Sequence, residues 1–187
     1  MLEALGVPMT ALVVGTVAML TDHKDHATLL SAAADVAARV PNAHFVIVGD
    51  GERRAALQAQ ASELGLLGRV VFTGFRQDLD RLIPAFDVFC LSSKMEGLGT
   101  SLLDAMCFAR PVVATAAGGI PEAVEDGVTG RVVPIQDPEA LAAALVGVLH
   151  DPEGRERLGR AGRGRFESRF SDTRMVEATL AVYDELR

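Results

Sequence analysis

Short apolar runs alternate with amphipathic stretches along most of the chain. Turn residues bound each apolar run, and the runs are 11–18, 44–48, 70–72, 88–91, 112–114 and 131–133. Runs this short and this continuously apolar are typical of strands buried on both faces of a parallel sheet. Helical patterns fill the intervals, at 26–39, 52–64, 78–84, 100–108, 120–125 and 138–149. The pattern predicts an α/β fold, with a Rossmann-like, doubly wound parallel sheet of about six strands flanked by helices.

The end of the chain follows a different pattern. Residues 153–170 form a helical stretch rich in Arg and Glu, and Ser171-Asp172 is suited to cap a further helix. That last helix, near 172–186, has apolar positions at helical spacing, which are Met175, Val176, Leu180, Tyr183 and Leu186. We therefore expect residues 152–187 to add C-terminal helices to the sheet domain.

Composition narrows the possible function classes. The 187 residues are 49% hydrophobic, enough for one domain with a substantial core. The net charge of −7 and the absence of Trp argue against nucleic-acid binding, which needs a positive surface and stacking platforms. No apolar run reaches the ~18 residues of a membrane helix. The two cysteines are expected to be reduced thiols, which indicates a cytoplasmic protein.

The strongest candidate for chemistry is the segment from Glu96 to Asp104. Gly97 and Gly99 precede a predicted helix, so the backbone can approach a ligand closely there. A helix N-terminus supplies free N–H groups and a positive dipole end for phosphate. The two carboxylates on either side can accept hydrogen bonds from sugar hydroxyls. These features together indicate a nucleotide-sugar site, whereas the alternative is a helix start capped by Ser101-x-x-Asp104.

Two other glycine turns follow predicted strands. Gly49-Asp50-Gly51 begins like a dinucleotide-binding motif, but Arg54 stands where the third glycine belongs. We interpret it as a structural or nucleotide-adjacent turn rather than an NAD site. The segment Gly118-Gly119-Ile120-Pro121-Glu122 is either a tight turn before a helix or a close approach to a ligand.

Charged residues near two strand ends offer further candidates. The run from Asp22 to His26 resembles metal ligands, but no matching set of ligands stands elsewhere in the chain, so a solvated loop is favoured. Lys24 in that run is placed to face a diphosphate. Gly74-Phe75-Arg76 follows the third strand and could touch a ligand, although Arg76 fits an ordinary surface position equally well.

The series of motifs resembles the carboxy-terminal, donor-binding domain of family 4 (group 1) glycosyltransferases, which have the GT-B fold. The resemblance covers nearly all 187 residues. The segments that carry it, in order, are Val14-Gly15-Thr16-Val17 with Lys24, Ile47-Val48-Gly49-Asp50-Gly51, Phe72-Thr73-Gly74-Phe75-Arg76, Glu96-Gly97-Leu98-Gly99 with Asp104, Pro111-Val112-Val113-Ala114-Thr115, Gly118-Gly119-Ile120-Pro121-Glu122 and Asp126-Gly127-Val128-Thr129-Gly130.

The resemblance implies retaining transfer of a sugar from a nucleotide-diphosphate donor, with no metal and no further cofactor. By this resemblance Lys24 would hold the diphosphate, Glu96 the donor sugar and Asp104 the ribose hydroxyls. The turn 74–76 would lie near the base. The implied catalytic residues are Glu96 and Lys24, and the implied donor-binding residues are Gly15, Thr16, Gly49, Gly74, Phe75, Arg76, Gly97, Leu98, Gly99, Thr100 and Asp104.

The chain departs from the family pattern in three respects. Met19 stands where the family usually has an Arg that shares the diphosphate with Lys24. Asp104 replaces a Glu, so its carboxylate reaches about 1.5 Å less far. By the resemblance, the acceptor site lies on an amino-terminal domain that we expect to be absent here, because Leu5-Gly6-Val7-Pro8 resembles the end of an interdomain linker. The last helix usually packs on that domain, so here we expect it to be loose or to cover its own core.

We therefore expect an isolated donor-binding half that transfers little sugar alone, because it cannot orient an acceptor. The implied partners are a nucleotide sugar, the amino-terminal domain and an acceptor that is a glycan, a lipid or a small molecule. The parent enzyme would be cytoplasmic, or peripheral to the inner face of the membrane. Alternatives are a degenerate module that binds a nucleotide sugar without catalysis, a nucleotide-sugar epimerase and an NAD-binding domain.

Overall fold

A six-stranded parallel sheet forms the centre of the computed structural model, which describes residues 2–185. The strands are β1 (Leu12–Val17), β2 (Ala43–Val48), β3 (Val70–Gly74), β4 (Val88–Leu91), β5 (Val112–Thr115) and β6 (Arg131–Val133). Their order is β3-β2-β1-β4-β5-β6, and every neighbouring pair is parallel. The predicted α/β class and doubly wound sheet are confirmed. The order reverses between β1 and β4, where such sheets open a ligand crevice.

The helices connect the strands much as the sequence predicts. They are α1 (His26–Arg39), α2 (Arg54–Glu63), α3 (Leu79–Leu82), α4 (Thr100–Cys107), α5 (Ile120–Ala123), α6 (Pro138–His150), α7 (Pro152–Arg169) and α8 (Asp172–Glu185). Short 3-10 turns stand at Leu2–Leu5, Asp22–Lys24 and Ile83–Ala85. The helix expected over 78–84 changes to a 3-10 turn at Ile83, since Pro84 has no N–H to continue an α-helix.

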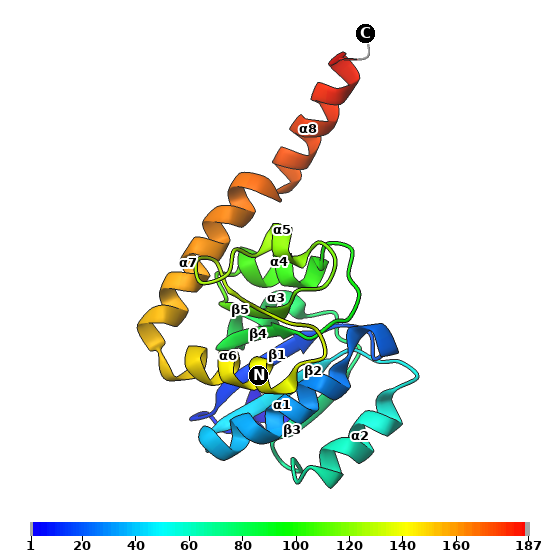
Figure 1. Ribbon diagram of the computed structural model, residues 1–187, viewed down its shortest axis with the longest axis vertical. Helices are drawn as coiled ribbons and strands as arrows, with labels where there is room; N and C mark the ends of the chain where they lie inside the picture. The colour runs from blue at the N-terminus through cyan, green and yellow to red at the C-terminus, as the bar shows by residue number, and fades with distance from the viewer. Residues whose placement is uncertain (1, 186–187) are drawn as a thin grey trace.

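Helices cover both faces of the sheet and produce two hydrophobic cores (Figure 1). On one face α1, α2 and α6 pack on the strands around Leu30, Phe45 and Leu145, all of which are buried. On the other face α3, α4 and α5 pack around Phe89 and Met106. Burial of strand side chains on both faces explains why the strands are continuous apolar runs.

The start of the chain belongs to the second core. Val7, in the segment expected to be the end of a linker, is only 1% exposed. Its neighbours in that core include Val13 of β1 and Phe86. This segment is therefore packed on the domain.

The two C-terminal helices behave differently from each other. α7 packs against α4 and α6, whereas α8 extends away from the body along the long axis (Figure 1). α8 contains no buried residue, so it does not cover the domain's own core. The Ser171 hydroxyl accepts a hydrogen bond from the Arg174 amide at 3.4 Å, as its predicted capping role requires. Leu186, which was expected to continue the apolar positions of this helix, lies outside the described residues. Within 2–185, no helix has the length and apolarity to cross a membrane.

Candidate functional site

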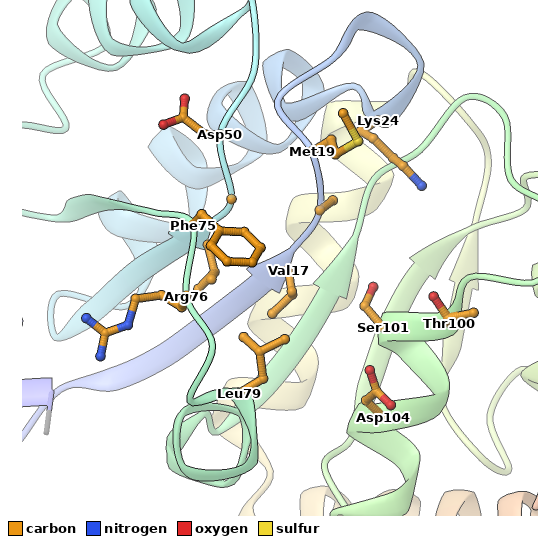
Figure 2. A pocket seen from close by; sticks show the side chains of 13 residues that line it. Val17, Met19, Lys24, Asp50, Phe75, Arg76, Leu79, Thr100, Ser101 and Asp104 are labelled. Atoms are coloured by element: carbon orange, nitrogen blue, oxygen red, sulfur yellow. The ribbon is translucent and has the colours of Figure 1, made fainter.

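A cavity of about 610 Å³ opens at the carboxyl ends of the strands. It lies where β1 and β2 end, between the segment that follows β3 and the N-terminus of α4 (Figure 2). Val17, Phe75 and Leu79 form one side, and Ser101 and Asp104 of α4 face them. The full lining is Val17, Ala18, Met19, Lys24, Val48, Gly49, Asp50, Phe75, Arg76, Leu79, Thr100, Ser101 and Asp104. The position is the one where doubly wound sheets bind ligands.

Lys24 stands at one end of this cavity. It closes the 3-10 turn Asp22–Lys24, and Asp25 then adopts a left-handed conformation and caps α1. The Asp25 carboxylate accepts hydrogen bonds from the Thr28 amide at 3.4 Å and the Thr28 hydroxyl at 2.8 Å. This cap fixes the loop that carries Lys24, whose side chain is only 19% exposed.

Lys24 forms an ion pair with Glu96, which lies 72 residues later in the loop after β4. The Glu96 side chain is only 8% exposed. Its Oε1 accepts hydrogen bonds from Lys24 Nζ and from Ser93 Oγ, the latter at 2.9 Å. Lys24 and Glu96 were both expected in one donor site, but the sequence did not predict that they contact each other.

A second, more open hollow of about 480 Å³ adjoins Glu96. Its lining is His23, Lys24, Met95, Glu96 and Gly97. Lys24 lines both this hollow and the larger cavity. A cation therefore separates two adjacent spaces, one beside Asp104 and the other beside Glu96.

The N-terminus of α4 has the features of an anion site. Its cap is Gly99, which is left-handed (φ 73°, ψ 64°) and has no side chain to accept hydrogen bonds from the first-turn amides. Ser101 lies inside the helix, so the capping-box alternative for Ser101 and Asp104 is wrong. Thr100 and Ser101 line the large cavity in the first turn. The free N–H groups and dipole of this turn suit a phosphate.

Asp104 faces the cavity from the second turn of α4 (Figure 2). Partial burial raises the pKa of its carboxyl above the usual range. Among residues 2–185, no side chain donates a hydrogen bond to the Asp104 carboxylate or forms an ion pair with it. A carboxylate in this condition is available to accept hydrogen bonds from a bound ligand.

Phe75 and Arg76 lie at the opposite wall, after β3. The Phe75 ring is 75% exposed and lies over the cavity (Figure 2). The Arg76 guanidinium points away and forms two hydrogen bonds to Asp78, at 2.8 and 2.6 Å. Asp78 thereby raises the pKa of Arg76. The side chain of Phe75, and only the stem of Arg76, is therefore placed for a ligand.

Two residues expected to contact the donor lie elsewhere. Gly15 and Thr16 are inside β1 and do not line the cavity. A Cβ at position 15 would meet the Phe86 ring at 2.1 Å, so packing explains this glycine. The Thr16 side chain is buried with only 2% exposure, because residues in the middle of a central strand face the cores. The carboxyl end of β1, at Val17, reaches the cavity instead.

The other four expected glycines take four different positions. Gly49 lines the large cavity and Gly97 the second hollow. Gly74 ends β3 with φ +75° and accepts the Gly49 amide at 2.9 Å. Leu98 and Gly99 form the turn into α4 and line neither space.

Two pairs of glycines, Gly49 and Gly51 after β2 and Gly118 and Gly119 after β5, allow close contacts between the loops that line the two spaces. A Cβ at Gly118 would lie 1.8 Å from the Glu96 carbonyl oxygen, and the Gly119 amide donates to the Gly97 carbonyl at 2.8 Å. A Cβ at Gly49 would likewise lie 2.0 Å from the Ala18 carbonyl oxygen. The close approaches that these glycines permit are therefore between loops of the protein. The sequence indicated that these glycines allow a close approach, but it did not indicate that the approaching groups are the carbonyls of Glu96 and Ala18.

Met19 lies beside Lys24 at the mouth of the cavity (Figure 2). Its side chain is 63% exposed and belongs to neither hydrophobic core. It stands near the site where a second cation would share an anion with Lys24.

His26, in the run that resembles metal ligands, is 2% exposed. Neither of its ring nitrogens has a hydrogen-bond partner among residues 2–185. Burial, together with the nearby charge of Lys24, lowers the pKa of His26 to about 4, so the ring is neutral. In the same described range, no group of three or more His, Cys, Asp or Glu residues is arranged to hold a metal ion.

Comparison with known proteins assigns the chain to a family. The sequence model for glycosyl transferases group 1 matches residues 2–165. The chain belongs to this family. One relative, the lipopolysaccharide core biosynthesis glycosyltransferase LpsE of Rhizobium meliloti (strain 1021), is 34% identical over 178 residues, which cover 95% of this chain and 51% of LpsE. The D-inositol 3-phosphate glycosyltransferase of Saccharomonospora viridis is 36% identical over 193 residues, 97% of this chain and 44% of that protein.

Several solved structures share the fold. HepE of Anabaena, determined with UDP-glucose, is 30% identical, with a TM-score of 0.87 over 96% of this chain and 51% of HepE. The C-terminal domain of the group 1 protein LpcC from Francisella tularensis is 22% identical, with a TM-score of 0.81 over 91% of both chains. The resemblance to the GT-B group 1 glycosyltransferases is thus confirmed. The chain spans about half the length of the curated relatives that it matches.

Proposed function

We propose that this chain is the donor-binding half of a retaining glycosyltransferase that moves a sugar, of the hexose type, from a nucleotide-diphosphate donor. The observation that carries the proposal is the position of Lys24 between two hollows, one bounded by Asp104 and the other by Glu96. A nucleotide sugar has the same order of parts: a nucleoside, a negatively charged diphosphate and a sugar.

Each part of the donor has a complementary group. The nucleoside would occupy the larger cavity, with the base near Phe75 and the ribose hydroxyls on Asp104. The diphosphate would lie between Lys24 and the first turn of α4, since a cation and a helix N-terminus both stabilise an anion there. The sugar would enter the second hollow and donate hydroxyl hydrogen bonds to Glu96.

Two comparisons support this assignment. HepE, at 30% identity, was determined with UDP-glucose, and the relatives named above are glycosyltransferases. The reaction would need no metal, because Lys24 and the α4 dipole supply the positive charge for the leaving diphosphate. The acceptor, which is a glycan, a lipid or a small molecule, would bind to a separate amino-terminal domain. The parent enzyme would work in the cytoplasm or at the inner face of a membrane.

A calorimetric titration with UDP, GDP and ADP, each free and as a sugar conjugate, tests the proposal. We expect selective binding of one nucleotide, weakened by Asp104→Asn, and weaker binding of its sugar conjugate in Glu96→Gln. A transfer assay on the same 187 residues should show little or no turnover, because no acceptor is oriented. Absence of binding at millimolar ligand would contradict the proposal.

Met19 favours a second candidate, a module that binds a nucleotide sugar without catalysis. The diphosphate would face one cation, Lys24, and the exposed thioether of Met19. Loss of one charge-assisted hydrogen bond to phosphate costs about 1.5–3 kcal/mol, or roughly ten- to a hundred-fold in affinity. Strong donor binding without transfer, even when the parent protein is complete, would support this second candidate.

A further inference from the structure

A chain of buried hydroxyl groups leads from β5 to the Glu96 carboxylate. Thr115 at the end of β5 donates from Oγ1 to the Ser93 carbonyl at 2.6 Å. Ser93 donates from its own Oγ to Glu96 Oε1 at 2.9 Å. Both Thr115 and Ser93 have no exposed surface. Thr115 thus fixes the backbone of the residue whose hydroxyl holds the carboxylate.

Of the two groups that hold Oε1, only Ser93 is independent of the ligand. Lys24 lines both hollows, so a bound diphosphate would compete with Glu96 for its ammonium. Ser93 lines neither hollow. We therefore expect this hydrogen bond to remain when a donor occupies the site.

The other carboxylate oxygen is left for a ligand. Within the described part of the chain, no donor contacts Glu96 Oε2. Glu96 is one of the residues that line the second hollow. A free Glu side chain rotates about several bonds, and its ordering on binding would oppose affinity. With Oε1 already held, the ligand does not have to order the side chain.

The main chain at Glu96 is held as well. Gly118 lies so close to the Glu96 carbonyl that a Cβ there would be 1.8 Å away, and the Gly119 amide donates to Gly97 at 2.8 Å. Backbone and side chain of Glu96 are thus both fixed from the end of β5. A site is most effective when its supporting groups are locked in this way before the ligand arrives.

We propose that Ser93, held by Thr115, is a positioning residue that orients Glu96 toward the sugar of the donor. The inference rests on the proposed function, and it assigns sugar recognition to a residue that touches no part of the donor. Ser93 acts on the sugar through Glu96 and has no contact with the diphosphate. Its effect should therefore appear in the affinity for the sugar conjugate but not in that for the free nucleoside diphosphate.

The test compares two affinities by calorimetry on the full 187-residue chain. The quantity measured is the ratio of the dissociation constant of the sugar conjugate to that of the free diphosphate. Because Ser93 acts on the sugar only through Glu96, loss of its hydrogen bond to the carboxylate predicts that Ser93→Ala raises this ratio by about 3–10-fold. Glu96→Gln should raise it in the same direction. An unchanged ratio in Ser93→Ala, with donor binding intact in the wild type, would overturn this inference alone.

Ser92→Ala is the matched control. Ser92 is the neighbouring residue, is 1% exposed and donates one hydrogen bond, to the Lys24 carbonyl at 3.1 Å. A purely structural effect of losing a buried hydroxyl would change both affinities equally, so Ser92→Ala should leave the ratio unchanged. An equal rise of the ratio in Ser92→Ala would also overturn the positioning role.

Two variants at Thr115 give an independent test if Ser93→Ala fails to fold. Thr115→Val removes the hydroxyl at nearly constant volume and should raise the ratio, while Thr115→Ser keeps the hydroxyl and should restore it. Identical ratios in the two variants would contradict the relay. No binding of any nucleotide by the wild-type chain would overturn the proposed function and this inference together.

Discussion

Lys24 and Glu96 are joined by an ion pair between the loop after β1 and the loop after β4. These are the two strands between which the sheet order reverses. Both side chains are largely shielded from water, so the pair is less screened than a surface pair. The pair keeps a cation at the boundary between the two hollows, where the proposed diphosphate would lie.

Replacement of Lys24 should weaken diphosphate binding selectively. We expect Lys24→Met to lower the affinity for a nucleoside diphosphate by about ten- to a hundred-fold, because one charge-assisted hydrogen bond to phosphate is lost. The affinity for the nucleoside without phosphates should change little. Titration calorimetry measures both. Lys94→Met is the matched control, since Lys94 pairs with Asp22 at 2.8 Å and lines neither hollow.

Met19→Arg should have the opposite effect. A guanidinium at this position would add a second cation beside Lys24, and we expect a gain of about ten- to a hundred-fold in diphosphate affinity. The gain should shrink as salt is raised, because part of it is a long-range attraction. Met9→Arg, at an 80% exposed position by the start of β1, adds the same charge away from the site. Equal affinities in both variants would mean that position 19 does not face the diphosphate.

The sheet could be predicted well from the sequence, because strands that are buried on both faces are apolar at nearly every position. The run Val88–Leu91 is apolar at every position, and all four residues are buried. The start of α4 was also predictable, since Gly97 and Gly99 mark a turn that must bend sharply before a helix. These are local signals, and they depend on residues next to one another in the chain.

Contacts between loops were not predictable in the same way. The ion pair of Lys24 with Glu96 and the approach of Gly118 to Glu96 depend on how loops after different strands meet. Arg76 was expected as a possible ligand contact, but Asp78 two residues later holds its guanidinium away from the cavity. Side-chain direction after a strand end follows the loop dihedral angles, which the residue pattern does not encode.

Gly118→Ala should lower stability more than an open glycine position does. Gly118 has φ +52° and Gly127 has φ +76°, so an alanine at either is strained by about 1–2 kcal/mol. A Cβ at Gly127 meets no atom within 4 Å, whereas one at Gly118 would overlap the Glu96 carbonyl. We expect Gly118→Ala to cost about 1–3 kcal/mol more than Gly127→Ala in urea unfolding. Equal costs would show that the loop at Glu96 yields without strain.

Stability should fall as pH drops from about 6.5 toward about 4 because of His26. The ring has a pKa of about 4 in the folded protein but about 6.5 when unfolded, so the unfolded state binds more protons in this interval. The free energy of unfolding thereby falls by at most about 3 kcal/mol as the pH drops. The stability that depends on the neutral His26 ring is fully present only above pH 6.5. Denaturant unfolding across this range measures the loss.

Variants separate His26 from other groups that titrate in the same range. His26→Leu should remove the part of the pH dependence between about 4 and 6.5. His44→Gln should keep it, because His44 is partly exposed in β2 and its ring bonds the Asn42 carbonyl at 3.2 Å. Carboxylates contribute equally to both profiles and cancel in the comparison. A His26→Leu profile parallel to that of the wild type would contradict the assignment.

Amide hydrogen exchange should distinguish α8 from the other long helices. α8 (14 residues) has no buried residue, while α6 (13 residues) buries most of one side against α1 and the sheet. An isolated helix of this length is marginal in water, so most helical stability must come from packing. We expect amides of Asp172–Glu185 to exchange through local opening long before those of Pro138–His150. Protection of α8 equal to that of α6 would mean that Met175, Val176 and Leu180 are covered in solution.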